Sequence, residues 1–273
     1  MTGAALTPRP VTPTSILAAE LAELCRELGT VAGLPAAVLD RAQWAGALAA
    51  GLDPYLDRCT SPESTALARL SERTAHTDWS ARAGGAVFLE QEMLSGHVEG
   101  KALQFLLHLA RCTRVLEIGM FTGYSALAMA EALPAGGTVL ACEIDPDVAR
   151  FARECFDASP FGDRITIAVG PALETLHQLP DTEPPFDFVF IDADKAGYLS
   201  YVDFLLSSPL LGPEAVIAVD NTLMQGQPYT GAGVTANGAA IATFNQAIAD
   251  DPRVEQVLIP LRDGLTLIRR APA

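Results

Sequence analysis

The chain has 273 residues, and 49% of them are hydrophobic, which is enough for one large α/β domain with an extension. Its formal net charge of −15 argues against a nucleic-acid partner and against substrates that carry several phosphates. The five cysteines are scattered without a Cys-x-x-Cys pair, as is typical of reduced thiols. No apolar stretch reaches about 18 residues, so neither a membrane span nor a signal peptide is expected. We therefore expect a cytoplasmic protein that binds neither nucleic acid nor membrane.

Residues 1–92 have a helical pattern and few candidates for chemistry. Apolar residues recur at helix spacing from residue 13, and the pattern continues over 35–48 and 65–79. Ser61-Pro62-Glu63 predicts the start of a helix, with the serine as its N-cap. We expect Trp44 and Trp79 to pack rather than to bind a ligand. We interpret residues 1–92 as an N-terminal helical extension that acts as a cap or as a dimerisation element.

Short β-rich runs alternate with helical stretches from Arg114 onward, a pattern typical of a parallel sheet with right-handed crossovers. After a helix near 239–249, two further runs flank Arg262-Asp263-Gly264 and predict an antiparallel hairpin. The runs that we expect to be strands are 115–118, 138–142, 165–169, 188–191, 216–219, 257–259 and 265–268. The fold class is therefore α/β, with a seven-stranded, mostly parallel sheet in residues 93–273 that ends in an antiparallel hairpin.

Two of the predicted strands run into acidic clusters. Asp192-Ala193-Asp194-Lys195 follows one strand, and Asp220-Asn221 follows the next strand along the chain. Neighbouring parallel strands deliver such residues to one carboxyl edge of the sheet, where open α/β proteins bind ligands. Oxygen ligands from Asp192, Asp220 and Asn221 suit a hard divalent cation, with Mg²⁺ as the first choice and Mn²⁺ or other divalent ions as alternatives.

Lys195 lies three residues after the first of these acids. It is one of only two lysines, whereas arginine supplies the remainder of the 18 positive side chains. Because arginine serves elsewhere as a fixed charge, a lysine here indicates an amine that can lose its proton. Lys195 is therefore a candidate general base. The alternative is an ion pair with Asp192 or Asp194, and spacing alone does not choose between the two.

A glycine-containing turn from Glu117 to Ser125 follows the first strand and leads into a helix. Its glycines, Gly119 and Gly123, allow close approach of a ligand, and the helix start presents free N–H groups to a carboxylate or phosphate. The turn lacks the Gly-x-Gly-x-x-Gly spacing of dinucleotide sites, which argues against an NAD-dependent oxidoreductase.

The second strand ends in Glu143. An acid at this place can accept hydrogen bonds from both hydroxyls of an adenosine ribose, and the alternative is a solvated strand end. An adenosine that carries a carboxylate but no phosphate fits the glycine turn and this acid together. We therefore expect S-adenosylmethionine rather than NAD.

Taken in order, these segments resemble the cation-dependent class I O-methyltransferases, the family that includes catechol and caffeoyl-CoA O-methyltransferases. The resemblance rests on Glu117-x-Gly119, Phe121 to Ser125, Glu143, Gly170-Pro171-Ala172-Leu173, Asp192 to Lys195, and Asp220-Asn221-Thr222-Leu223. It implies a Rossmann-like methyltransferase domain over residues 93–273 and, as in the family, a homodimer.

The resemblance also implies roles for individual residues. Asp192, Asp220 and Asn221 would hold the cation, Lys195 would be the general base, and Asp192 would also contact the cofactor. The expected S-adenosylmethionine site comprises Met93, Ser95, Glu117, Gly119, Phe121, Ser125, Glu143, Ala172 and Asp192.

A closer likeness links the chain to the O-methyltransferases of mycosporine biosynthesis, which convert demethyl-4-deoxygadusol to 4-deoxygadusol. It rests on the runs at 50–56, 89–97 and 251–258. Methyl transfer from a sulfonium needs an anionic oxygen held behind the methyl group, so a cation that chelates two adjacent oxygens favours a vicinal enediol or a catechol as substrate. Caffeoyl-CoA is disfavoured because few Lys or Arg residues lie near the site to bind its phosphates.

Two alternatives to the proposed substrate and function remain open. A catechol-type enzyme of another secondary metabolite differs only in its substrate, and a non-catalytic adenosine-binding or regulatory module would not need Asn221 or Lys195.

The segment 222–238 is rich in Gly, Gln and Thr and follows the predicted metal ligands directly. We expect a substrate-covering loop there, with a disordered surface insertion as the alternative.

Overall fold

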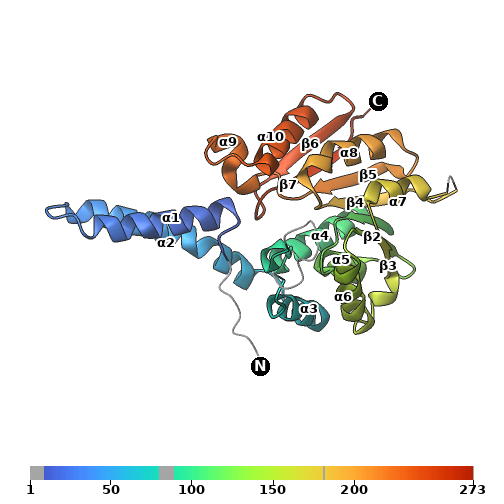
Figure 1. The fold of residues 1–273 in the computed structure, drawn as a ribbon, viewed down its shortest axis with the longest axis horizontal. Helices are drawn as coiled ribbons and strands as arrows, with labels where there is room; N and C mark the ends of the chain where they lie inside the picture. Colours follow the sequence, from blue (N-terminus) through green and yellow to red (C-terminus); the bar gives the residue numbers. More distant parts are fainter. Residues whose placement is uncertain (1–8, 80–88, 181, 273) are drawn as a thin grey trace.

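The structure is a computed structural model that describes residues 9–79, 89–180 and 182–272. Within these residues, one seven-stranded sheet has helices on both faces (Figure 1). The strand order is β3-β2-β1-β4-β5-β7-β6, and only β7 runs antiparallel to both of its neighbours. The strands are β1 (Arg114–Ile118), β2 (Thr138–Glu143), β3 (Ile165–Val169), β4 (Phe186–Ile191), β5 (Leu211–Val219), β6 (Val254–Ile259) and β7 (Leu265–Arg270). The predicted fold class, with its terminal antiparallel hairpin, is confirmed.

Strand β5 begins five residues before the predicted run. Gly212 and Pro213 stand near its start, and both residue types are poor strand formers, so the sequence pattern does not reveal this part. The pairing of β4 with β5 is irregular there, between Phe186 and Phe188. A bulge of this kind accommodates such residues without ending the strand.

Alternate side chains of the strands pack into two separate cores, one on each face of the sheet. Val115 and Phe188 belong to the first core, whereas Leu116 and Val189 belong to the second. The first core is covered by α3 (Thr65–Ala75), α4 (His97–Ala110), α5 (Tyr124–Ala132) and α6 (Pro146–Asp157). The second is covered by α7 (Ala172–Gln178), α8 (Tyr198–Ser207) and α10 (Ala236–Ala249). The sheet is thus buried on both faces, and its carboxyl edge is left for a site.

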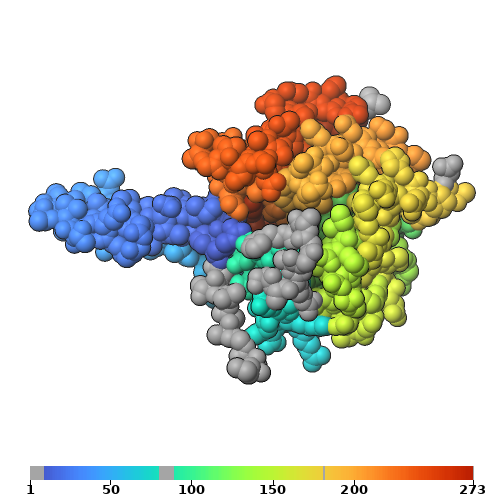
Figure 2. Space-filling model, in the orientation of Figure 1, coloured from blue at the N-terminus to red at the C-terminus, as the bar shows by residue number. Residues whose placement is uncertain are grey.

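Helices α1 (Pro13–Leu28) and α2 (Ala36–Cys59) pair with each other and project from the body as an arm (Figures 1 and 2). Neither helix has a buried residue. Trp44 on α2 is 68% exposed, so the expectation that it packs is wrong for the single chain. Trp79 is buried and contacts Phe121 and Phe151. Of the 1–92 extension, residues 1–8 and 80–88 lie outside the described residues.

The serine that caps α3 is not the predicted one. Ser64 accepts a hydrogen bond from the Leu67 N–H at 3.1 Å, and α3 begins at Thr65. Ser61 instead offers its carbonyl oxygen to His97 Nε2 at 2.6 Å. Both serines precede an apolar helical pattern, so the sequence pattern alone does not distinguish them.

The segment 222–238 is more regular than the expected loop. It contains η5 (Met224–Gly226) and α9 (Gln227–Thr230), and α10 begins within it at Ala236. Thr235 caps α10 by accepting a hydrogen bond from the Gly238 N–H at 3.1 Å. The other short 3₁₀ turns are η2 (Gln91–Met93), η3 (Gly162–Arg164) and η4 (Lys195–Gly197). None of the described helices is both long and apolar enough to cross a membrane.

Candidate active site at the carboxyl edge of the sheet

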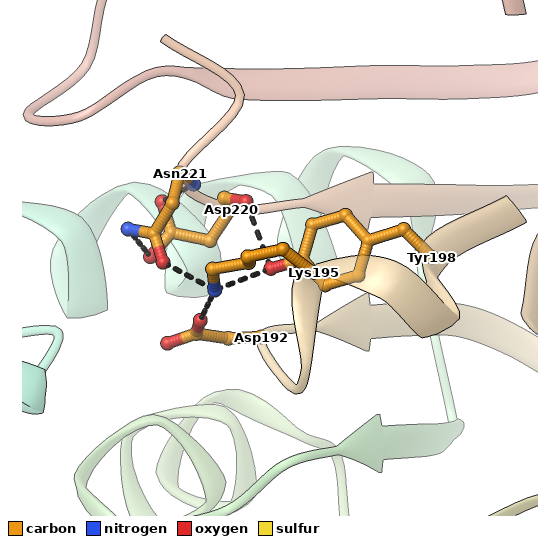
Figure 3. Close-up of polar contacts among 5 residues, drawn as sticks. All are labelled: Asp192, Lys195, Tyr198, Asp220 and Asn221. Carbon is orange, nitrogen blue, oxygen red and sulfur yellow. Dashed lines mark hydrogen bonds and ion pairs between the residues drawn. The ribbon is translucent and has the colours of Figure 1, made fainter. Parts of the chain in front are cut away.

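The two acidic clusters meet where β4 and β5 end side by side (Figure 3). The Asp192 N–H donates to the Ile118 carbonyl at 2.9 Å, and the Asp220 N–H donates to the Ile191 carbonyl at 2.9 Å. Each acid is therefore held by a backbone hydrogen bond that extends the sheet by one residue. Asp192, Asp220 and Asn221 lie together, as the sequence predicts for neighbouring parallel strands.

Lys195 places its ammonium group among the oxygens of this cluster (Figure 3). Its Nζ donates to Asp192 Oδ1 at 2.8 Å, to Asn221 Oδ1 at 2.7 Å and to the Tyr198 hydroxyl at 2.7 Å. The buried Tyr198 hydroxyl in turn donates to the Asp220 carbonyl at 3.1 Å. The Lys195 side chain is only 12% exposed, so its charge depends on these oxygens rather than on water.

Asp220 and Asn221 form a rigid pair. The Asn221 N–H donates to Asp220 Oδ1 at 2.7 Å, and Asn221 Nδ2 donates to Asp220 Oδ2 at 3.1 Å. Asn221 has a φ of +59°, in the left-handed region that asparagine tolerates better than most residues. Burial and the nearby Asp192 carboxylate together raise the pKa of Asp220 to about 7, although Lys195 and Arg262 oppose the rise. Positive charge at this edge therefore limits, but does not cancel, the cost of burying the ionised Asp220 carboxylate.

The turn of the terminal hairpin anchors the loop that follows these residues. The Leu223 N–H donates to the Asp263 carbonyl at 2.8 Å, and the Gln225 N–H donates to Asp263 Oδ1 at 2.6 Å. Met224 and Gln225 both have positive φ values, of 39° and 56°. Such conformations persist only where surrounding contacts impose them, and they concentrate at functional sites. The hairpin, distant in sequence, therefore helps to fix the rim of the site.

A cavity beside the acidic edge contains most of the residues predicted for the cofactor. Met93, Ser95, Gly119, Phe121, Ser125 and Asp192 line it, together with Leu94, Met120 and Tyr124. Gly119 has a φ of +87°, and a Cβ there would lie 2.1 Å from the Asp192 carbonyl oxygen. Only glycine allows the turn after β1 to pass this close to the end of β4.

Glu117 is fully buried at the end of β1, and neither of its carboxylate oxygens has a hydrogen-bond partner. Burial raises its pKa well above the ordinary value, and the nearby Ser125 hydroxyl opposes this rise without making a hydrogen bond of normal geometry. A buried carboxyl with two unpartnered oxygens needs a donor. The ammonium group of an amino-acid moiety is a donor of the required kind.

Glu143 ends β2 in a fixed orientation. Its Oε2 accepts from the Phe121 N–H at 2.7 Å, and its Oε1 accepts from the Asp145 N–H at 2.9 Å. Burial raises the pKa of Glu143, and these backbone donors oppose that rise. Each carboxylate oxygen can accept a further hydrogen bond. Ala172, at the start of α7, is buried outside the cavity described above.

Three residues at the acidic edge, Tyr198, Glu99 and Arg262, are not predicted from the sequence. Tyr198 follows Lys195 by three positions, which is the spacing of neighbours on a helix. Glu99 stands at helix spacing from the buried Leu103 and Leu107, so an acid in the apolar stripe of a predicted helix was the available signal. Arg262 belongs to the predicted hairpin turn, and nothing in the sequence pattern indicates that its side chain reaches this site.

In the part of the chain that the structure describes, no three His, Cys, Asp or Glu side chains are grouped as for a metal ion. The predicted ligand set is of a different composition, with two carboxylates and one amide. Oxygens of two of its members, Asp192 and Asn221, accept hydrogen bonds from the ammonium group of Lys195, which is itself a cation. The donor chemistry therefore fits a hard divalent ion.

Comparison with known proteins identifies the family. A sequence model of the O-methyltransferase family matches residues 58–271. Caffeoyl-CoA O-methyltransferase 2 of Zea mays is 34% identical over 230 residues, which cover 79% of this chain and 80% of that protein. The caffeoyl-CoA O-methyltransferase of Petroselinum crispum is 35% identical over 217 residues, with coverages of 76% and 85%. The chain belongs to the O-methyltransferase family.

The solved structures agree with this assignment. The SAH-bound methyltransferase of Podospora anserina superposes with a TM-score of 0.70 at 29% identity and covers 82% of this chain and 96% of its own. The predicted enzyme class, an S-adenosylmethionine-dependent O-methyltransferase, is confirmed at the level of the family. The family match begins at Arg58, so the arm lies almost entirely outside it.

Proposed function

We propose that this enzyme methylates one hydroxyl of a small cyclic vicinal enediol and that it requires a divalent cation, most simply Mg²⁺. The observation that carries the proposal is the meeting of Asp192, Asp220 and Asn221 beside the Lys195 ammonium group. These three side chains would hold the cation. When bound, the ion supplies chelation of two adjacent substrate oxygens and stabilises the deprotonated form of one of them.

Lys195 is proposed as the general base. Its Nζ lies within hydrogen-bonding distance of two of the proposed ligand residues, so a substrate hydroxyl bound at this edge lies within its reach. The Tyr198 hydroxyl and Asp192 orient the amine from two sides. An ion-pair role with Asp192 is the alternative, and it predicts that the Lys195→Arg variant keeps near-normal turnover.

The cavity beside this edge is proposed as the S-adenosylmethionine site. Glu117, with its unpartnered oxygens, would accept hydrogen bonds from the methionine ammonium group, and Glu143 would accept them from the ribose hydroxyls. Met93, Ser95, Gly119, Phe121, Ser125 and Asp192 would enclose the remainder, with Ala172 beside the adenine. Asp192 belongs to both sites, so it sets the position of the methyl donor relative to the acceptor.

We propose demethyl-4-deoxygadusol, a precursor in mycosporine biosynthesis, as the substrate. The sequence likeness described above supports this choice, and an enediol-like ring presents two adjacent oxygens as chelation requires. A catechol of another secondary metabolite is the alternative. The positive side chains that act on Asp220 are Lys195 and Arg262, which is little for the phosphates of coenzyme A. A non-catalytic adenosine-binding module is the alternative from another class of protein. Such a module would not require Lys195 and the side chains that surround it.

The test is an incubation of the purified enzyme with S-adenosylmethionine, Mg²⁺ and each of four acceptors. These are demethyl-4-deoxygadusol, catechol, L-DOPA and caffeoyl-CoA, and the products are read by mass. We expect the gain of one methyl group on demethyl-4-deoxygadusol and its loss in the presence of EDTA. Full activity in EDTA contradicts the cation requirement, and preference for another acceptor contradicts the substrate assignment.

We further propose a cytoplasmic homodimer in which residues 1–92 serve as a helical extension to a methyltransferase domain at 93–273. The exposed apolar side chains of the arm support self-association, because a stripe of this kind on a soluble helix commonly marks an interface. Helix α3, within the proposed extension, contributes Leu67 and Leu70 to the first core. The extension is therefore proposed as continuous with the domain rather than as a separately folding unit.

A further inference from the structure

Arg262 stands in the turn between β6 and β7, and its side chain crosses to the segment that lines the cofactor cavity. Its Nη1 donates to the Leu94 carbonyl at 3.1 Å, a contact between residues 168 positions apart in the sequence. The same atom lies 3.8 Å from Glu99 Oε2, in the first turn of α4. Leu94 lines the cavity together with its neighbours Met93 and Ser95. The side chain of Arg262 therefore holds this lining in place from a distant part of the chain.

The fit between the guanidinium group and this segment is close. Gly96 has a φ of +78°, and a Cβ there would lie 2.7 Å from Arg262 Nη1. A side chain at this position would displace the guanidinium group or the segment, so glycine preserves the contact. Glu99 is 1% exposed and adds a negative charge at ion-pair distance. A carbonyl and a carboxylate together restrict the orientation of the guanidinium group.

The backbone of the same turn contacts the acceptor side of the site. The Leu223 N–H donates to the Asp263 carbonyl at 2.8 Å. Leu223 follows by two residues Asn221, one of the proposed cation ligands. The turn thus contacts the acceptor side through its backbone and the cofactor side through Arg262.

The backbone conformation of Arg262 is not one that its side chain favours. Its φ is +49°, in the left-handed region that suits glycine and asparagine. Such conformations persist where surrounding contacts impose them, and they concentrate at functional sites. Glycine at this position would lose both the hydrogen bond to Leu94 and the ion pair with Glu99. These contacts are therefore what a long cationic side chain supplies at this turn.

Resting on the proposed function, we propose that Arg262 is a positioning residue that joins the cofactor cavity to the acceptor edge. By fixing Leu94 and its neighbours relative to the hairpin turn, it sets the distance between the methyl donor and the acceptor oxygen. Methyl transfer depends steeply on that distance, and a displacement of about 1 Å can lower the rate by about 100-fold. Arg262 acts through these two segments, not on the reacting atoms.

The test compares Arg262→Met, which keeps a long side chain without donors or charge, with Arg262→Lys, which keeps both. SAH affinity is measured by calorimetry, and kcat and the acceptor KM are measured with the preferred acceptor of the four above. We expect Arg262→Met to weaken SAH binding by about 10-fold and to lower kcat by about 10- to 100-fold. The acceptor KM should change little, because the backbone contact of Asp263 remains. Arg262→Lys should restore most of the SAH affinity and of kcat.

Arg153→Met is the matched control and should leave SAH affinity and kcat unchanged. Arg153 also donates to a backbone carbonyl, that of Ile165, at 2.6 Å. Ile165 is the first residue of β3, so this contact lies at the amino edge of the sheet, opposite the site.

A second variant separates positioning from charge balance. Loss of Arg262 leaves the buried Glu99 carboxylate without this cation, which endangers the fold. The double variant Glu99→Gln, Arg262→Met removes both charges, and its Tm shows that it is folded. We expect it to retain the defects in SAH affinity and kcat. Recovery of wild-type values would show that Arg262 only balances the charge of Glu99, and the inference would be overturned.

The outcomes separate this inference from the function on which it rests. If the wild-type enzyme methylates none of the four acceptors, the substrate proposal fails, whereas SAH affinity still reports on Arg262. Unchanged SAH affinity in Arg262→Met overturns the inference and leaves the proposed function intact. Equal defects in Arg262→Met and Arg262→Lys also overturn it, because either change then merely disturbs the turn.

Discussion

Lys195 illustrates how one side chain can satisfy two demands at the residue scale. As an ammonium group it stabilises Asp192 and Asn221, whose oxygens lie 2.8 and 2.7 Å from its Nζ. As a neutral amine it can accept the proton that an acceptor hydroxyl must lose before methyl transfer. Arginine meets only the first demand, since its guanidinium group stays protonated in proteins. The two roles are therefore separable by substitution.

We predict that Lys195→Ala and Lys195→Arg both lower kcat at neutral pH by about 10²- to 10⁴-fold, the usual contribution of a general base. SAH affinity, measured by calorimetry, should change little, because Lys195 does not line the cofactor cavity described above. Lys101→Ala is the control, since this second lysine bonds Gln104 on α4 instead. Near-normal turnover in Lys195→Arg would show that the residue is only an ion-pair partner.

The residues at the acidic edge differ in how far the sequence could reveal them. Asp192, Asp220 and Asn221 directly follow strands whose apolar runs are unmistakable, so their convergence follows from the geometry of a parallel sheet. Glu99 and Arg262 come from α4 and from the hairpin turn, and their approach depends on how those elements pack. Tertiary distances of this kind have no local sequence signature. The glycine turn from Glu117 to Ser125 could be predicted because its glycines are needed for a local backbone conformation that other residues rarely adopt.

At the scale of elements, the arm differs from the rest of the described chain because it leaves an apolar helix face exposed. Four large side chains on α2, spaced as neighbours on one helix face, are exposed: Trp44, Leu48, Leu52 and Tyr55. The helical pattern predicts the helices correctly, because periodicity reports an apolar face. It does not report whether that face meets the same chain or a second copy, which is why the prediction for Trp44 was wrong.

We predict that the double variant Trp44→Glu, Leu48→Glu converts a homodimer into a monomer, because two charges in a buried apolar interface lose their hydration. Analytical ultracentrifugation over a concentration series measures the change. Ala50→Glu places a comparable charge on an exposed position of α2 outside this apolar face and serves as the control. A wild-type protein that sediments as a monomer contradicts the homodimer, and a double variant that remains dimeric places the interface elsewhere.

His97 joins the base of the arm to α4. Its Nδ1 lies 2.8 Å from Asp57 Oδ1, and its Nε2 lies 2.6 Å from the Ser61 carbonyl oxygen. Both partners are acceptors, so the contact is complete only when both ring nitrogens carry protons. Burial by itself lowers the pKa of His97, but the Ser61 carbonyl and the Asp57 carboxylate outweigh it and raise the pKa above its ordinary value.

A raised pKa in the folded state means that protonated His97 stabilises the protein. This stabilisation is fully present below about pH 6.5, the ordinary pKa, and is lost as the pH rises through the folded-state value. We predict that His97→Gln lowers the free energy of unfolding more at pH 6 than at pH 9. Urea denaturation across this range measures the difference. Asp57→Asn should likewise lower the free energy of unfolding more at pH 6 than at pH 9. A difference that is independent of pH would show that the imidazole contributes by packing alone.

At the scale of the whole molecule, negative charge is both spread over the surface and concentrated at the site. The net charge of −15 makes any cation mildly stabilising through screening. The acidic edge differs from the surface because burial keeps its charges from water, as the raised pKa of Asp220, about 7, reflects. Binding at this edge therefore stabilises the folded chain by mass action, whereas screening depends only on ionic strength.

We therefore predict that Mg²⁺ at about 100 times its dissociation constant raises the stability of the enzyme by about 2.7 kcal/mol. In a domain of this size, this corresponds to a rise in Tm of about 5 to 10 °C by thermal denaturation. EDTA should reverse the rise, and NaCl at equal ionic strength should not reproduce it. Asp220→Asn should lose the response to Mg²⁺ while keeping the response to SAH, because Asp220 does not line the cofactor cavity. Equal shifts with NaCl and Mg²⁺ would mean that surface screening alone acts, and the acidic edge would then have no specific affinity for the ion.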